Sequence, residues 1–397
     1  MNPGPRARWA SAHSTLADSG FAMEEAGAAI RAEMGEGPVD LVLLFLGAAH
    51  VRNAEAMSAA LRARLTPGCL MGAGAHGVVC RDHEVETGPA VSVVAARLPG
   101  VSIRPFLLTQ DLWRDALGDA EAFASAAPGV LGAEVVLMLA DPFSLDMERV
   151  LAAFHRHAKG VRIAGGMASA APRPRGNVVL LNDWASHEGG VAVALHGPIR
   201  ADVIVSQGCR PVGPLLTVTR AEGNLILELD GQPAVERAEQ ALRALADHER
   251  EALQNGLYVG RPARAGAEGR GDWLIRNLLG ADRSRGAIAV ADIIAERERV
   301  RLHVRDRETA REDLEMLLSP QAFDARPDAA LLFACNGRGR GLYGRPDGDL
   351  SPLQKALGNV PAAGMFCAGE IGPVGERNFL HGHTASIVIL REAVRRE

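Results

Sequence analysis

One pattern of strands and a helix recurs three times along the chain, and it limits the fold more than any other feature. Each copy opens with an apolar run, continues with residues at helical spacing, and closes with a second apolar run. The opening runs are 40–47, 134–139 and 328–333, the helices are 53–65, about 145–157 and 351–357, and the closing runs are 90–94, 191–195 and 386–390. A period of roughly a hundred residues is too long for a solenoid. The sequence therefore predicts duplicated α/β modules.

A glycine-rich segment lies between the helix and the closing run of every copy. We expect each segment to form a turn after a strand, with Gly74, Gly166 and Gly369 in matching places. Gly74 precedes Ser92 by 18 residues and Gly369 precedes Ser386 by 17, so the spacing nearly repeats. These glycines are interpreted as part of a frame that the copies share.

The order of the elements predicts an α/β fold with mixed sheets, because consecutive strands occur beside strand–helix–strand units. We expect two packed domains with helices covering the sheets. A turn-rich boundary at 211–214 divides them, and a helix over 234–253 opens the second. The stretch 256–304 is interpreted as a fourth, degraded copy, in which 286–291 and 300–304 form paired strands.

Composition excludes several classes of protein. Of the 397 residues, 47% are apolar and 23% charged, which is typical of a globular protein with a large core. The net charge of -5 argues against a partner that is nucleic acid or an anionic membrane. The apolar run 41–46 is too short to span a bilayer, and residues 1–12 lack the apolar core of a signal peptide. Five scattered cysteines form no disulfide framework, so we expect a cytoplasmic protein.

The third copy carries the densest polar chemistry. A buried strand is followed by the segment 335–341, which contains Cys335, Asn336, Arg338 and Arg340. The carboxyl end of such a strand is where α/β proteins place ligands, and an arginine there can hold a carboxylate or phosphate with two hydrogen bonds. A flexible turn with solvated arginines remains an alternative. Cys335 is either a nucleophile beside arginines or a small buried apolar residue.

Glu370 follows the third glycine segment, and it has no acidic counterpart in the other copies. The aligned residues are Ala75 and Met167. A carboxylate present in one copy alone suggests a role at a site, and a ligand amine is the partner we expect. A salt bridge to a nearby arginine is the alternative.

His381 and His383 precede the last closing run. If Gly382 continues a strand, both imidazoles point to the same face, since side chains two apart do so. The spacing of cysteines and histidines matches no paired CxxC or HExxH pattern, so no metal site is predicted. A hydrogen-bonded or ligand-contacting pair is the preferred interpretation. No catalytic triad or Gly-x-Ser-x-Gly elbow is visible.

These motifs resemble those of FIST proteins, in which an N-terminal FIST domain precedes a C-terminal one. The resemblance depends on 335–339, on 364–375, on Asn378 and on 381–386, and more weakly on Gly72–Gly77 in the first copy. It extends over nearly the whole chain, from about Phe21 to Leu390. The domains implied are an N-terminal extension, 1–27, a FIST N-terminal domain with two internal repeats, 28–213, and a FIST C-terminal domain, 214–397.

The resemblance implies a sensory module of signal transduction that binds a small ligand, with amino acids suggested. Bacterial modules of this kind are often fused to methyl-accepting, histidine-kinase or cyclic-dinucleotide output domains, and eukaryotic ones occur in an F-box protein. No residues remain here for an output domain, so a separate signalling partner is expected. The expected ligand-binding residues are Cys335, Asn336, Arg338, Gly369, Glu370, Asn378, His381 and His383.

Three other functions stay open at this point. Some bacterial members of the family are reported as haem-binding nitric oxide sensors, so a haem with a histidine axial ligand is an alternative, although no cofactor is predicted. A cysteine-dependent enzyme would use Cys335 as its nucleophile, but no base partner is visible. A structural adaptor without a ligand is the remaining possibility.

Overall fold

The computed structural model describes residues 6–393 apart from 265, 267, 268 and 270. They divide into two compact units. The three-sheet unit contains the described residues up to 205, residues 314–380 and those from 384 onward. The antiparallel unit contains residues 206–313 and 381–383. The α/β prediction is confirmed, since helices and mixed sheets occur together in the described part of the chain.

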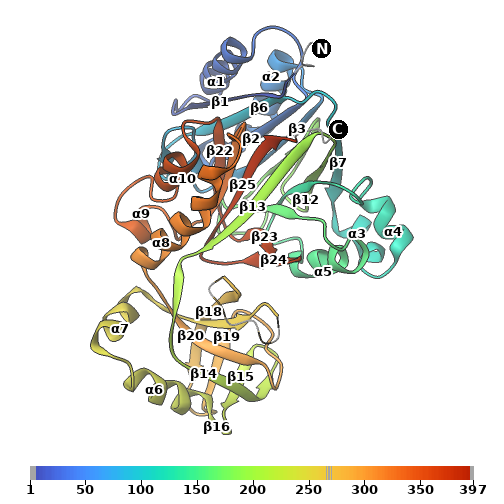
Figure 1. Cartoon of the computed structure of the whole chain (residues 1–397). Helices are drawn as coiled ribbons and strands as arrows, with labels where there is room; N and C mark the ends of the chain where they lie inside the picture. Colours follow the sequence, from blue (N-terminus) through green and yellow to red (C-terminus); the bar gives the residue numbers. More distant parts are fainter. Residues whose placement is uncertain (1–5, 265, 267–268, 270, 394–397) are drawn as a thin grey trace. The chain divides into compact units, whose positions relative to one another are not determined.

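The three predicted copies are real and lie in the three-sheet unit (Figure 1). The first has β1 (Arg8–Ser14), α1 (Ser19–Met34), β2 (Leu41–Gly47), η1 (Ala48–Asn53), α2 (Ala54–Leu65), β3 (Cys69–Ala75), β4 (Val78–Val79), β5 (Glu84–Val85) and β6 (Val91–Arg97). The second has β7 (Ser102–Leu108), α3 (Gln110–Ala116), α4 (Ala120–Ala126), β8 (Val135–Ala140), α5 (Met147–His157), β9 (Ile163–Met167), β10 (Val179–Leu181), β11 (Trp184–Ser186) and β12 (Gly190–His196). The third has β13 (Ile199–Gln207), α8 (Arg307–Leu318), η3 (Ser319–Phe323), β21 (Ala329–Cys335), α9 (Arg340–Tyr343), α10 (Leu350–Leu357), β22 (Ala362–Cys367), β23 (Glu370–Val374), β24 (Arg377–His381) and β25 (Thr384–Glu392).

The copies share one strand register. In each, the opening strand pairs in parallel with the strand after the helix and antiparallel with the closing strand. The fourth residue of the opening strand lies opposite a glycine in all three, in the pairs Leu44↔Gly72, Met138↔Gly165 and Leu332↔Gly364. A Cβ at these glycines would lie 2.4, 1.8 and 1.9 Å from the facing carbonyl oxygen, so the strands pack too closely for any side chain.

This finding corrects the predicted glycine turns. Gly74 and Gly166 lie within β3 and β9, and only Gly369 lies in a bend after a strand. The glycines are needed for close packing between strands. In a sequence, such a glycine-rich stretch looks the same as one that forms a turn. By register, Gly369 corresponds to Gly77 of the first copy, and Glu370 corresponds to Val78, the first residue of β4.

Each sheet is completed by a hairpin from another copy. The strand orders are β1-β6-β2-β3-β10-β11, β24-β23-β9-β8-β12-β7 and β13-β25-β21-β22-β4-β5. The hairpin β10–β11 of the second copy thus extends the first sheet, β23–β24 of the third extends the second, and β4–β5 of the first extends the third. This cyclic exchange makes the three copies mutually dependent.

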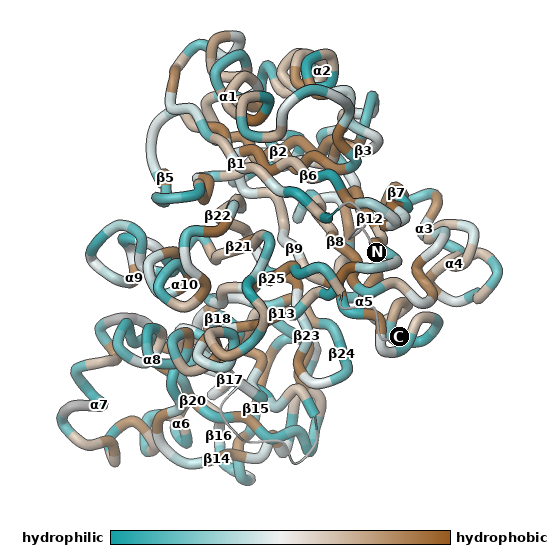
Figure 2. Tube along the Cα trace, turned by 45° about the horizontal axis from the view of Figure 1, so that its top comes forward, coloured by the Kyte–Doolittle hydropathy of each residue, from teal (hydrophilic) through white to brown (hydrophobic). Residues whose placement is uncertain are grey.

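The two faces of each sheet bury different sets of side chains. Alternate residues of the opening strands, such as Leu43, Leu137 and Leu331, belong to one core that all three sheets share. The residues that alternate with them pack against helices. These are α1 and α2 in the first copy, α3 to α5 in the second, and α8 and α10 in the third. Strands covered on both faces read as continuous apolar runs. Figure 2 shows β2 and β3 in the brown of such residues.

The antiparallel unit has a seven-stranded sheet in the order β14-β20-β17-β18-β19-β15-β16. Its elements are β14 (Cys209–Glu222), β15 (Leu225–Leu229), β16 (Gln232–Pro233), α6 (Ala234–Arg243), α7 (Asp247–Ala252), η2 (Leu253–Asn255), β17 (Leu257–Pro262), β18 (Trp273–Asp282), β19 (Ala287–Val290) and β20 (Arg299–Arg305). The apolar stripe of α6, with Ala238 and Ala241, packs on this sheet.

Three predictions for this region are wrong. The strands predicted to pair at 286–291 and 300–304 are β19 and β20, which are not neighbours in the sheet. The pairings described within this sheet are antiparallel, so it is not a fourth copy of the module. The helix predicted over 234–253 is interrupted after Arg243, because Ala246 adopts an extended backbone before α7.

Candidate functional site

The candidate site lies where β21 and β22 of the third copy end. Cys335 and Cys367 are paired across these parallel strands, and Asn336 donates its backbone N–H to the Cys367 carbonyl at 2.9 Å. The chain then turns through Gly339, whose φ of 57° favours glycine, into α9. A Cβ at Gly339 would meet the Glu86 carboxylate at 2.6 Å, and that carboxylate accepts the backbone N–H of Arg340.

Arg338 is the centre of a buried polar network. Its side chain is fully buried, and its Nε and one terminal nitrogen donate to the two Asp349 oxygens at 2.8 and 2.6 Å. That terminal nitrogen also donates to the Tyr343 hydroxyl, which donates to Asp349. Burial alone would lower the pKa of Arg338, but the Asp349 carboxylate raises it, so the guanidinium stays charged. Arg338 was predicted to hold a ligand carboxylate or phosphate with two hydrogen bonds, and in the structure the acceptor of two such bonds is the Asp349 carboxylate of the same chain.

Glu84 joins the network from the exchanged hairpin β4–β5. Its Oε1 accepts the backbone N–H groups of Asp349 and Leu350, at 3.2 and 2.9 Å, where α10 begins. Burial and the neighbouring Asp349 charge raise the pKa of Glu84 to about 8. The first copy therefore contributes a carboxyl group to the polar core of the third.

Glu370 is a second buried carboxyl group of the site. Its side chain is 0% exposed, and Oε2 accepts the backbone N–H and the hydroxyl of Thr384 at 3.1 and 2.8 Å. Among the described residues, Oε1 has no N–H or O–H donor. The Cys335 thiol forms a side-chain hydrogen bond to the carboxyl, and both this bond and the Arg338 charge lower the pKa. Burial outweighs all of these contacts and raises the pKa of Glu370 to about 8. The carboxyl is thus held mostly protonated near neutral pH.

The predicted ligand-binding residues fall into separate groups. Cys335, Arg338 and Glu370 lie together, with Cys335 half-buried, Asn336 exposed and Gly369 buried beside them. The Asn378 side chain instead bonds to the backbone of Ile163 and Val161, where it fastens β24 to β9. His381 and His383 belong to the antiparallel unit.

The predicted strand through Gly382 is wrong. β24 ends at His381 and β25 begins at Thr384, and His383 has a φ of 65°, so the two imidazoles do not alternate as in a strand. His383 Nε2 lies 2.8 Å from Asn277 Oδ1, and its ring centroid lies 4.3 Å from that of Tyr258.

Three residues of the network were missed by sequence reasoning. Tyr343 and Asp349 follow Arg338 within 11 residues, yet nothing local marks them as its partners. Glu84 is 265 residues from Asp349 and lies in a two-residue strand, which carries no periodicity. Only the exchange of hairpins brings it to the site.

The stability of the wild type relative to Glu370→Gln should fall as pH rises. The folded-state pKa of about 8 exceeds the ordinary 4.5, so the folded protein binds a proton that the unfolded chain releases. This contribution is complete below about 4.5 and is lost as pH rises through about 8. Urea unfolding of both proteins across this window measures the effect. Parallel stability curves for the two proteins would contradict the raised pKa.

Comparison with known proteins places the chain among FIST proteins. The model of the FIST N domain matches residues 40–232, and that of the FIST C domain matches residues 234–373. The chain belongs to the FIST family. FIST domains are proposed sensory domains of signalling proteins, and the FIST resemblance of the sequence motifs is thereby confirmed.

Relatives of this FIST protein occur in mycobacteria. An uncharacterized protein of Mycobacterium tuberculosis strain H37Rv is 36% identical over 383 residues, covering 95% of this chain and 97% of the relative. An uncharacterized protein of Mycobacterium bovis is 36% identical over 373 residues, covering 93% and 94%.

Among solved structures, a cyanuric acid hydrolase from A. caulinodans is similar at a TM-score of 0.39 and 9% identity, covering 98% of this chain and 100% of that one. A likeness at this level carries no conclusion about activity. Separately, none of the helices described in this FIST protein is long and apolar enough to cross a membrane.

Proposed function

We propose that this FIST protein is a sensory protein that binds a small ligand through a cationic nitrogen, with amino acids as the ligand class. The observation that carries the proposal is the Glu370 carboxyl, which is 0% exposed and whose Oε1 has no N–H or O–H donor among the described residues. An unpaired buried oxygen costs the folded protein about 1–3 kcal/mol. Such a cost is typical of positions that a ligand completes.

A ligand ammonium group would supply the missing partner. On binding, Glu370 releases its proton to solvent, and the carboxylate formed pairs with the ammonium while Thr384 continues to donate to Oε2. Cys335 is half-buried and contacts this carboxyl, so we propose that an entering ligand passes its side chain. Opening of this side chain and its turn is part of the proposed binding step, since Glu370 is sealed from solvent.

Arg338 then has a supporting role. Its charge is already matched by Asp349, so we propose that it holds the turn over the site and favours the ionised form of Glu370. We propose binding without catalysis, with the ligand signal passed to a separate partner protein.

Thermal-shift screening of the full chain against L-amino acids and small amines tests this function. Binding must raise the melting temperature, because a ligand specific for the folded state stabilises it. A hit should stabilise the wild type and lose its effect in Glu370→Gln. The matched control is Glu376→Gln, which changes an exposed carboxyl and should keep the shift. A library without any hit, or a hit that Glu370→Gln binds equally well, would overturn the proposal.

A further inference from the structure

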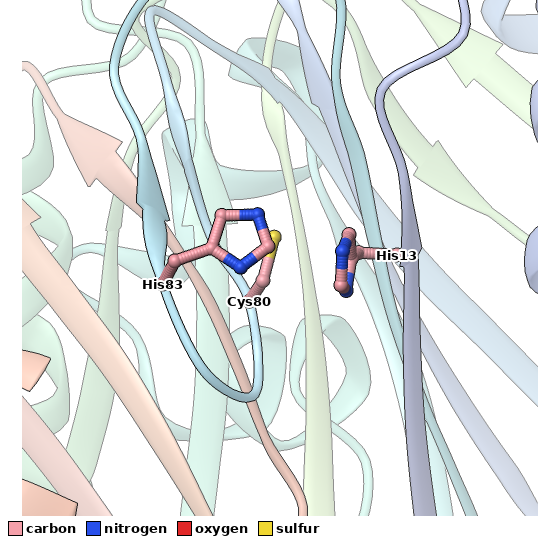
Figure 3. Close-up of side chains that lie close together, drawn as sticks. All are labelled: His13, Cys80 and His83. Atoms are coloured by element: carbon pink, nitrogen blue, oxygen red, sulfur yellow. The ribbon is translucent and has the colours of Figure 1, made fainter.

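A second cluster of chemically active side chains lies in the three-sheet unit. His13 comes from β1, and Cys80 and His83 come from the turn that joins β4 to β5. One ligand atom from each residue lies within 4.8 Å of those of the other two. Figure 3 shows Cys80 and His83 on one loop, with His13 reaching toward them from the strand opposite.

The backbone holds two of these residues at a set spacing. Cys80 donates its N–H to the His83 carbonyl at 2.9 Å, which closes the hairpin turn and places both side chains on one side of it. The Cys80 side chain is buried, whereas both histidines are half-buried. The cluster therefore has a sulfur at its base and an opening to solvent beside the imidazoles.

Asp82 orients the imidazoles. Its Oδ1 lies 2.7 Å from Nδ1 of His83 and 3.9 Å from Nδ1 of His13. A carboxylate on Nδ1 directs the other ring nitrogen, Nε2, toward a metal, and this arrangement is common around histidine ligands. The His13 and His83 rings meet edge to face with their centroids 4.4 Å apart, so a nitrogen of each ring could bind the same ion.

We propose that His13, Cys80 and His83 form a binding site for zinc or a similar transition metal ion. Sulfur and imidazole ligands suit zinc and exclude calcium and magnesium, which require oxygen. In a tetrahedral zinc site such ligand atoms lie roughly 3.3–3.6 Å apart, so these side chains close by about an ångström on binding. The Cys80 thiol gives up its proton to solvent as the Zn–S bond forms, and the fourth position is left to water.

The site would connect two sheets. His13 lies in β1, the edge strand of one sheet. Cys80 and His83 lie in the turn of the β4–β5 hairpin, at the edge of the sheet that contains β21 and β22. The same β4–β5 hairpin carries Glu84 to the Arg338 network. A metal ion would thus fasten the exchanged hairpin at its turn.

Titration of the metal-free full chain with Co²⁺ tests the site. A thiolate–Co²⁺ charge-transfer band, with the visible bands of tetrahedral cobalt, is the expected result, and Zn²⁺ should displace both. Cys80→Ser should lose the charge-transfer band, and the matched control Cys69→Ser, another buried thiol, should keep it. Asp82→Asn should bind about 10- to 100-fold more weakly, as loss of an orienting carboxylate does.

Two further variants keep the test decisive if Cys80→Ser does not fold. His13→Ala and His83→Ala each remove one ligand with a half-buried side chain, and each should weaken Co²⁺ binding and alter the visible bands. A wild type without the charge-transfer band, or variants with the wild-type spectrum and affinity, would overturn the proposal.

Discussion

Arg338→Met should destabilise the fold by about 3–5 kcal/mol, because it leaves the Asp349 carboxylate buried without its charge partner. Both side chains are 0% exposed, and three hydrogen bonds from Arg338 are lost, two to Asp349 and one to Tyr343. The nearby Glu84, with a pKa of about 8, is mostly protonated near neutral pH and supplies no charge that could compensate Asp349. Urea unfolding followed by circular dichroism measures the loss.

Two control variants test whether the loss of stability comes from breaking the buried Arg338–Asp349 pair or from removing any arginine. Arg340→Met changes an exposed side chain on the same turn and should stay within about 0.5 kcal/mol of the wild type. The double variant Arg338→Met/Asp349→Leu should recover much of the loss, since an apolar replacement of both partners removes the unpaired charge. Equal unfolding midpoints for Arg338→Met and Arg340→Met would show that the network contributes little.

Gly364→Ala should cost about 3 kcal/mol, because its Cβ would lie 1.9 Å from the Leu332 carbonyl oxygen. The clash is with backbone at the centre of a parallel strand pair, so no side chain can move to relieve it. Gly165→Ala should behave alike, since the same contact is 1.8 Å and the φ of Gly165 is 150°. The loss is again read from urea unfolding.

Gly341→Ala provides the comparison. This glycine lies in α9, and a Cβ added there meets nothing within 4 Å, so the fold should be unaffected or slightly more stable. If Gly364→Ala and Gly165→Ala were as stable as Gly341→Ala, the close strand packing common to the three copies would be refuted.

The frame of the molecule could be predicted because its strands are buried on both faces. The runs that begin at 41, 135 and 329 are continuous in apolar residues, and their three helices have residues at helical spacing. The threefold repetition of these runs and helices could be recognised in the sequence for the same reason.

The pairing of distant segments could not be predicted. The strands β4 and β5 have two residues each, so no periodicity marks them or shows which sheet they join. The sequence marks Arg338 and Glu370 as polar residues near strand ends, but their partners Asp349 and Thr384 depend on side-chain packing. His13 lies 67 residues before Cys80, so their meeting requires the folded sheets.

The titration of the Glu370 carboxyl is the most direct test of the proposed site. Carbon-13 spectra are recorded of protein labelled at the glutamate side-chain carboxyls, from below pH 4.5 to above pH 8. Comparison of the wild type with Glu370→Gln identifies the Glu370 signal by difference. We predict a signal that titrates near 8 and is absent from the variant. A Glu370 signal that titrates near the ordinary value of 4.5 would contradict a buried carboxyl that awaits a cationic ligand.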